Sequence, residues 1–281
     1  VFPDAVEIPE EHCQSIAREL NLSATTFVLP TTREGCHFHV RIFTPARELP
    51  MAGHPTLGTA AVLALEGRIG AGGHDSGEVI FLEGVGPVPV TFAVVGPHRV
   101  FATMNQPLPR FEAEVSDRAL IARMLSLEAE DLLAEAPPQA VSCGVPFLFV
   151  PLRTLEAAGR AKLRLDLWEP LAEACGAPGV YLFTMETEWP GSTVHGRMFA
   201  PGAGVAEDPA TGSATGPLGC YLVRHGLVES AGRVEIVCEQ GLEMGRPSRL
   251  QIAVESQGGD FSAVEVGGQS VVVGGGWLQL P

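Results

Sequence analysis

The chain has 281 residues, of which 46% are hydrophobic and 18% are charged, and its formal net charge is −15. This length suffices for two domains of ordinary size, and the composition is that of a folded, globular protein. An acidic chain without a run of consecutive Lys and Arg is not expected to bind nucleic acid or an anionic membrane, because both need clustered positive charge.

The sequence predicts neither a membrane span nor a metal site. The longest uncharged apolar stretches, near 55–65 and 209–223, are too short or too rich in Gly and Pro to cross a bilayer. His37 and His39 share one face of an expected strand but have no third ligand nearby. The cysteines of the chain are Cys13, Cys36, Cys143, Cys175, Cys220 and Cys238. They form no CxxC pair, so we expect them to be reduced and the protein to be cytoplasmic.

The first part of the chain predicts a helix, several strands and a second, buried helix. Apolar spacing indicates a helix over 10–20. Residues 55–65 carry no charge, which predicts a helix that is buried on every side inside a wrapped sheet. Alternating and β-branched runs predict strands at 25–30, 37–45, 77–96 and 99–107.

The second part of the chain follows a proline-containing crossing at 104–109. Helices are expected over 117–127 and near 168–175. A second buried helix should begin near Ser213, because Pro217 is tolerated only in a first turn. That start leaves 207–212 as a loop aimed at the helix N-terminus. Further strands are expected at 145–152, 179–185, 234–241, 248–256 and 267–280.

Two segments about 155 residues apart carry the same pattern. Residues 41–63 read RIFTPARELPMAGHPTLGTAAVL, and residues 197–218 read RMFAPGAGVAEDPATGSATGPL. The aligned pairs are Arg41–Arg197, Phe43–Phe199, Pro45–Pro201, Pro55–Pro209, Gly58–Gly212 and Ala60–Ala214. A repeat of this period is too long for a solenoid and predicts two homologous domains. We expect the first domain to comprise 1–107 plus roughly 268–281, and the second to comprise 108–267.

The two copies differ just before the shared proline, where one has His54 and the other Asp208. Two facing helix N-termini would present free backbone N–H groups to a small carboxylate. His54 and Asp208 could then accept and donate a proton at the bound molecule. Ser213 and Thr211 would supply hydroxyls at the start of the second helix.

A structural reading of these residues stays open. An Asp before Pro is often only a turn or capping residue, and a single His is often structural. Glu48 and Glu207 flank the two motifs and could be solvated or could orient His54. Because no G-x-S-x-G surrounds Ser213, a serine hydrolase is disfavoured.

The longer motifs resemble those of the phenazine-biosynthesis PhzF-like isomerase family, within the diaminopimelate-epimerase-like fold. The resemblance rests on IARELNLSATTFVL, the two repeated segments above, EQGLEMGRPS and VEVGGQSVVVGGG. It implies an α+β fold of two pseudo-symmetric domains, each a mostly antiparallel sheet rolled around a central buried helix. It further implies a homodimer with the site between the domains, and hydrogen transfer on a small carboxylated metabolite without cofactor or metal.

The resemblance assigns roles to individual residues. His54, Asp208 and Ser213 match active-site positions of the family, and the backbone of Gly53 and Gly212 would contact substrate. The family's main proton carrier is a glutamate in a segment resembling L-S-E-x-T-F. This chain has Ala24 at that position.

Ala24 leaves three readings open. It could mark the loss of one group from an otherwise standard isomerase site, or Asp208 or Glu48 could have become the base for another substrate. Alternatively, the chain could be a catalytically silent small-molecule-binding protein on the same scaffold. Racemases of this fold use two facing cysteines, which would fall near Ala52 and Asp208; no cysteine is near either position, so this chemistry is disfavoured. The favoured prediction is a PhzF-like isomerase that lacks one proton carrier.

Overall fold

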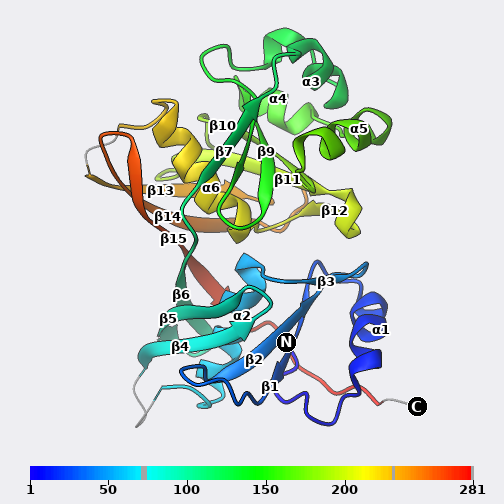
Figure 1. The fold of residues 1–281 in the computed structure, drawn as a ribbon, viewed down its shortest axis with the longest axis vertical. Helices are drawn as coiled ribbons and strands as arrows, with labels where there is room; N and C mark the ends of the chain where they lie inside the picture. Colours follow the sequence, from blue (N-terminus) through cyan, green and yellow to red (C-terminus); the bar gives the residue numbers. More distant parts are fainter. Residues whose placement is uncertain (71–74, 230–231, 280–281) are drawn as a thin grey trace.

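A computed structural model describes residues 1–70, 75–229 and 232–279, and it shows an α+β fold (Figure 1). The strands are β1 Thr25–Leu29, β2 Phe38–Phe43, β3 Glu48–Leu49, β4 Ser76–Glu83, β5 Gly86–Gly96, β6 Arg99–Asn105, β7 Arg110–Glu114, β8 Gln139–Ser142, β9 Pro146–Leu152, β10 Gly179–Thr184, β11 Val194–Ala200, β12 Val205–Asp208, β13 Gly232–Gln240, β14 Ser248–Gln257 and β15 Asp260–Val271. The α-helices are α1 Glu10–Leu20, α2 Gly53–Leu65, α3 Arg118–Met124, α4 Leu155–Arg160, α5 Leu165–Cys175 and α6 Gly212–Arg224, and short 3-10 turns are η2 Ala129–Asp131 and η3 Pro201–Ala203.

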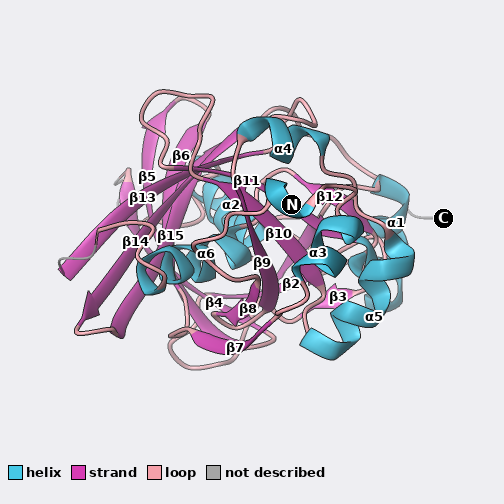
Figure 2. Cartoon of the chain, turned by 90° about the horizontal axis from the view of Figure 1, so that it is seen from above, coloured by secondary structure: helices cyan, strands magenta, loops and turns pink. Residues whose placement is uncertain are grey.

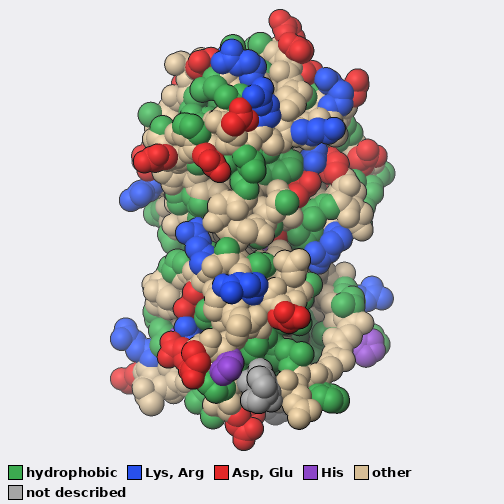
Figure 3. Space-filling view, turned by 90° about the vertical axis from the view of Figure 1, so that its right-hand side faces the viewer, with side chains coloured by type: hydrophobic (Ala, Val, Ile, Leu, Met, Phe, Trp, Pro, Cys, Tyr) green, Lys and Arg blue, Asp and Glu red, His purple; other side chains and the backbone are tan. Residues whose placement is uncertain are grey.

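The strands form one continuous, mostly antiparallel sheet. Its order is β1-β2-β4-β5-β6-β15-β14-β13-β11-β10-β9-β8-β7, with β3 paired to β2 and β12 paired to β11. The parallel pairs are β2·β4, β9·β10 and β11·β13. The sheet curls into two halves that are stacked along the long axis, and the outline narrows between them (Figures 1 and 3). The long strand β15 pairs with β6 of one half and β14 of the other, and so joins the two halves.

Each half is rolled around one buried helix. α2 packs against β5, β6 and β15, and α6 packs against β8, β9, β14 and β15. Both helices lie among the strands when the molecule is seen from above (Figure 2). Leu63 of α2 and Leu218 of α6 have no exposed surface, as expected for helices that are apolar on every side. These observations confirm the predicted fold class; the domain boundaries remain a prediction.

Shorter helices cover the outer faces of the sheet. α1 begins with Glu10 and Glu11, whose charges favour a helix N-terminus, and ends where Asn21 adopts a left-handed conformation at φ 50°. Its apolar side packs on Phe27 and Phe43. α3, α4 and α5 cover β9 and β10 of the other half, with Trp168 at the centre of that contact.

Several predicted boundaries are wrong. Pro217 lies in the second turn of α6 rather than the first, and Glu207 and Asp208 end strand β12 instead of lying in a loop. The last strand begins at Asp260 and ends at Val271, so 272–279 is not strand, and residue 280 lies outside the described residues. The strands β3, β7, β8, β11 and β12 and the helix α4 were not predicted. Among the described residues, no helix is long and apolar enough to cross a membrane.

Candidate functional site

The N-termini of the two buried helices meet at the junction of the two halves. Gly53 is the first residue of α2 and Gly212 is the first residue of α6. Their backbones are so close that a Cβ built on Gly53 would lie 2.5 Å from the Gly212 Cα. Neither of these described helix starts has a side-chain cap. Their first N–H groups are therefore free to bind an anion, which the helix dipoles favour.

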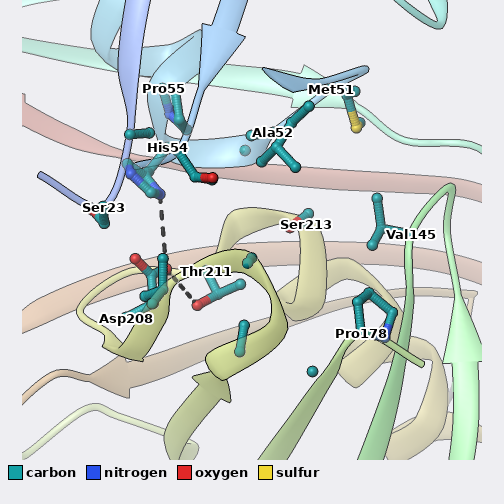
Figure 4. Close-up of a pocket in the computed structure, with 18 of the residues that line it drawn as sticks. Ser23, Met51, Ala52, His54, Pro55, Val145, Pro178, Asp208, Thr211 and Ser213 are labelled. Carbon is teal, nitrogen blue, oxygen red and sulfur yellow. Dashed lines mark hydrogen bonds and ion pairs between the residues drawn. The ribbon is translucent and has the colours of Figure 1, made fainter. Parts of the chain in front are cut away.

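A cavity of about 340 Å³ lies beside this meeting point and is lined by both halves. Its wall is mainly apolar. Residues that form this wall include Met51, Ala52, Val145, Phe147, Pro178 and Met198. In the close-up, Met51 and Ala52 lie on one side and Val145 and Pro178 lie on the other (Figure 4). An apolar cavity with a few converging polar groups is typical of a small-molecule site.

His54 and Asp208 face each other across the junction (Figure 4). The His54 Nδ1 atom lies 3.9 Å from the Asp208 Oδ2 atom, and the side chains are 35% and 6% exposed respectively. The Thr211 hydroxyl donates a hydrogen bond of 2.7 Å to the same Asp208 oxygen. Water and substrate can therefore reach His54, whereas Asp208 is buried and is held in place by Thr211.

The structure brings most of the predicted site residues to this cavity. His54, Asp208, Ser213, Thr211, Gly53 and Ala24 all line it. Gly212 contacts Gly53 and lines a second cavity of about 380 Å³, which His54 also lines. His54 belongs to the first turn of α2, whereas Asp208 ends β12 before α6 begins. His54 and Asp208 align in the two repeated segments but are not structurally equivalent. His54 lies within its helix, whereas Asp208 precedes its helix.

Glu48 and Glu207 do not orient His54. Glu48 accepts hydrogen bonds of 2.7 and 2.8 Å from Arg41, and Glu207 accepts bonds of 2.8 and 3.0 Å from Arg197. The Arg41 guanidinium lowers the pKa of the Glu48 carboxyl chiefly through these hydrogen bonds. Glu48 lines the cavity, but its carboxylate is held by Arg41, which also pairs with Glu10 at 2.8 Å.

Ala24, where the family resemblance predicts a glutamate, lies at the cavity. Ala24 immediately precedes β1 and lines the cavity together with Ser23. Ala24 thus lines the same cavity as His54 and Asp208.

Sequence reasoning missed Arg47, which also lines the cavity. Its guanidinium is exposed and has no ion-pair or hydrogen-bond partner within the part of the chain that the structure describes. Arg47 lies close in the sequence to the AGHP motif, and this nearness could have identified it as a residue of the site. An unpaired cation at an otherwise apolar cavity favours an anionic ligand.

Sequence reasoning also missed Glu83, a buried carboxyl beneath the start of α2. Its side chain is 3% exposed, and its Oε2 atom has no hydrogen-bond partner among the described residues. Burial raises the pKa of Glu83 to about 7. The Thr56 oxygen lies 2.6 Å from both the Glu83 Oε1 atom and the Ala52 carbonyl oxygen. Because the Thr56 hydroxyl has only one proton, protonated Glu83 can donate the second hydrogen bond.

Comparison with known proteins agrees with this fold. The family model described as phenazine biosynthesis-like protein matches residues 1–276. A trans-2,3-dihydro-3-hydroxyanthranilate isomerase of Pseudomonas fluorescens is 37% identical, with 100% of this chain and 92% of the relative covered. An uncharacterised isomerase of Mesorhizobium japonicum is 39% identical, with 94% and 87% covered. A crystal structure of a Bacillus anthracis PhzF-family phenazine biosynthesis protein aligns with a TM-score of 0.85 at 27% identity, covering 96% of this chain and 89% of that one.

The chain has an α+β fold of the epimerase-like class, and its named relatives are isomerases. The chain belongs to the phenazine biosynthesis-like protein family. Among the described residues, no group of three or more His, Cys, Asp or Glu side chains is placed to hold a metal ion.

Proposed function

We propose that this chain is a cofactor-independent isomerase that moves a hydrogen on a small carboxylated metabolite. The observation that carries the proposal is the His54–Asp208 pair, which the two halves bring together in an apolar cavity beside two uncapped helix N-termini. The similarity to dihydrohydroxyanthranilate isomerases supports a substrate of dihydroanthranilate type.

The carboxylate of such a substrate would bind between the helices. Free backbone N–H groups at Gly53 and Gly212 would donate hydrogen bonds to it, and the Ser213 hydroxyl would add a further donor. Arg47 would hold a negative group at the edge of the same cavity. The apolar wall would cover the ring and exclude water.

His54 and Asp208 would handle the protons. A hydrogen shift within one molecule needs a group that accepts a proton at one carbon and a group that donates a proton at another. Imidazole does both at neutral pH, and a carboxylate that accepts a hydrogen bond from Thr211 is available as its partner. With Ala24 in place of a glutamate, we expect this chemistry to be slowed by roughly 10²–10⁴-fold.

The alternative is a catalytically silent binding protein on the same scaffold. Ala24 is the observation that favours it, because the cavity and its anion-binding features persist without the third proton carrier. A carboxylate ligand that stabilises the protein without any turnover would support this alternative.

The test is an NMR assay in D₂O with trans-2,3-dihydro-3-hydroxyanthranilate and related carboxylates. The proposal predicts isomerisation or deuterium incorporation, and loss of both in His54→Ala and in Asp208→Asn with the fold retained by circular dichroism. Turnover that survives both substitutions would contradict it. The domain boundaries, the homodimer and the cytoplasmic location stay predictions.

A further inference from the structure

Gln240 is a buried polar residue directly beneath the segment that carries Asp208. It ends β13 and has no exposed surface. Its Nε2 group donates hydrogen bonds of 2.7 Å to the Asp208 carbonyl oxygen and 2.9 Å to the Thr211 hydroxyl oxygen. Its Oε1 atom accepts bonds of 2.9 Å from the Tyr181 hydroxyl and 3.2 Å from the Thr211 backbone N–H. One side chain thus holds both ends of the loop between β12 and α6.

The neighbours of Gln240 allow only one orientation of its amide. The Asp208 carbonyl can only accept, so it requires the NH₂ group, and the Thr211 backbone N–H can only donate, so it requires the oxygen. A flipped amide would leave both of these buried groups unpaired, which is costly. The orientation is therefore set by the backbone itself.

This orientation determines the direction of the Thr211 hydroxyl. Because Gln240 donates to the Thr211 oxygen, the single proton of that hydroxyl must be donated elsewhere. It is donated to the Asp208 Oδ2 atom at 2.7 Å. A hydrogen bond donated to a carboxylate favours the ionised form of that carboxylate.

The far end of Gln240 is packed as tightly as its near end. The Tyr181 ring lies against the backbone of Gly196, and a Cβ at Gly196 would overlap the Tyr181 hydroxyl group. Burial, together with the neighbouring Cys238, raises the pKa of Tyr181 well above its usual range, so its hydroxyl keeps the proton that it donates to Gln240.

We propose that Gln240 is a positioning residue that acts on Asp208 through Thr211. It holds the Asp208 segment in place and directs the Thr211 proton to the Asp208 carboxylate, which keeps that carboxylate oriented towards His54. The consequence for turnover rests on the proposed function; the effect on Asp208 itself does not.

Other titratable groups interact with Asp208, and the test must leave them unchanged. They are His54 on α2, 3.9 Å from the Asp208 carboxylate, and Tyr181 on β10. Glu207, which precedes Asp208 on β12, is paired with Arg197, and Cys238 contacts Tyr181. None of them is substituted in the variants below.

The experiment follows the Asp208 carboxyl carbon by NMR against pH in the whole protein labelled with ¹³C-aspartate. The signal is assigned by its loss in Asp208→Asn. Thr211→Val removes the hydroxyl, and we expect the Asp208 titration midpoint to rise by roughly one pH unit. Thr211→Ser retains the hydroxyl and should restore the midpoint. An unchanged midpoint in Thr211→Val would overturn the proposal.

Gln240→Leu tests the residue itself. We expect a rise in the Asp208 midpoint in the same direction, and little further rise when Gln240→Leu is added to Thr211→Val, because the two residues act in series. Should Gln240→Leu not fold, Gln240→Glu keeps the shape of the side chain and offers the Thr211 proton an acceptor other than Asp208, so the midpoint should again rise. A fully additive double variant would overturn the proposal.

Gln139→Leu is the matched control. Gln139 is also buried and hydrogen-bonded, to the Glu112 carbonyl oxygen and to His225, but it does not line the cavity. Its replacement should lower stability and leave the Asp208 midpoint unchanged.

The two proposals can fail separately. If the Asp208 midpoint responds as expected in the Thr211 and Gln240 variants while no carboxylate substrate is turned over, the positioning role stands and the proposed function fails.

Discussion

The backbones of Gly53 and Gly212 are in direct contact, so the two halves of the molecule meet through residues that have no side chains. A Cβ on Gly53 would lie within 2.7 Å of the Gly212 Cα and C atoms and the Ser213 N atom, all of which are backbone. This contact places two helix N-termini side by side and brings His54 within 3.9 Å of Asp208. The close approach of glycines is therefore what allows a shared site to exist.

Gly53→Ala should disturb this junction. Neither neighbouring backbone can move aside cheaply, so we expect a loss of about 1–3 kcal/mol in the free energy of unfolding. Denaturant unfolding followed by circular dichroism measures it. Gly58→Ala in the same helix is the control: a Cβ there meets nothing within 4 Å, and the substitution should stabilise the protein by about 0.5–1 kcal/mol. Equal effects at both positions would show that the contact is loose.

Glu83 should make stability depend on pH. Its pKa is about 7 in the folded protein, against 4.5 for an ordinary glutamate. Between these values the folded state holds a proton that the unfolded state has lost, so the free energy of unfolding falls as the pH rises from 4.5 to 7. The fall is on the order of 3 kcal/mol. Glu83→Gln should abolish it, whereas Glu78→Gln, an exposed residue on the same strand, should retain it.

His195 should contribute a second pH dependence in a higher range. It is 2% exposed, and its ring nitrogens lie 2.9 Å from Glu239 and 2.8 Å from Glu243. Burial acts to lower its pKa, but the hydrogen bonds with these two carboxylates raise it above 6.5. Its stabilisation is therefore complete below pH 6.5 and is lost as the pH rises through the folded pKa.

His195→Gln removes the cation from between the buried Glu239 carboxylate and the partly exposed Glu243 carboxylate. We expect a loss of about 3–5 kcal/mol in the free energy of unfolding at pH 6. The dependence on pH above 6.5 should disappear with it. His98→Gln, on the exposed surface, should change neither quantity. If His195→Gln were as stable as its parent at pH 6, the charge interactions of His195 with Glu239 and Glu243 would make no net contribution to the free energy of unfolding.

Arg47→Gln should weaken substrate binding without changing the chemical step. Within the described part of the chain, Arg47 lines the cavity and makes no hydrogen bond or ion pair with His54 or Asp208, so we expect its charge to act on bound and reacting substrate alike. We therefore expect a KM increase of roughly tenfold at unchanged kcat, weakening with added salt. Arg33→Gln, an exposed arginine that does not line the cavity, is the control. A decrease in kcat alone would assign Arg47 a different role.

Much of this fold could be predicted from the sequence because its signals are local. The periodicity of 10–20 and the absence of charge over 55–65 lead directly to α1 and to the buried α2. The repeated motif and the family resemblance pointed to His54 and Asp208, and the structure places both at one cavity.

The remaining features depend on contacts between distant residues. β7 and β8 pair with each other across an intervening helix, and no local pattern marks that pairing. Pro217 lies in the second turn of α6, because packing of that helix inside the sheet outweighs the loss of one hydrogen bond. Glu83 and Gln240 gain their roles from burial beneath α2 and beneath the Asp208 loop, which the sequence around them does not reveal.

Restoring the missing carboxylate tests the central claim most directly. We would compare this chain with Ala24→Glu and, as a control of similar shape without charge, Ala24→Gln, by NMR in D₂O with trans-2,3-dihydro-3-hydroxyanthranilate. The account predicts that Ala24→Glu isomerises the substrate and incorporates deuterium roughly 10²–10⁴ times faster than the other two. No turnover by any of the three, or equal turnover by all of them, would contradict it.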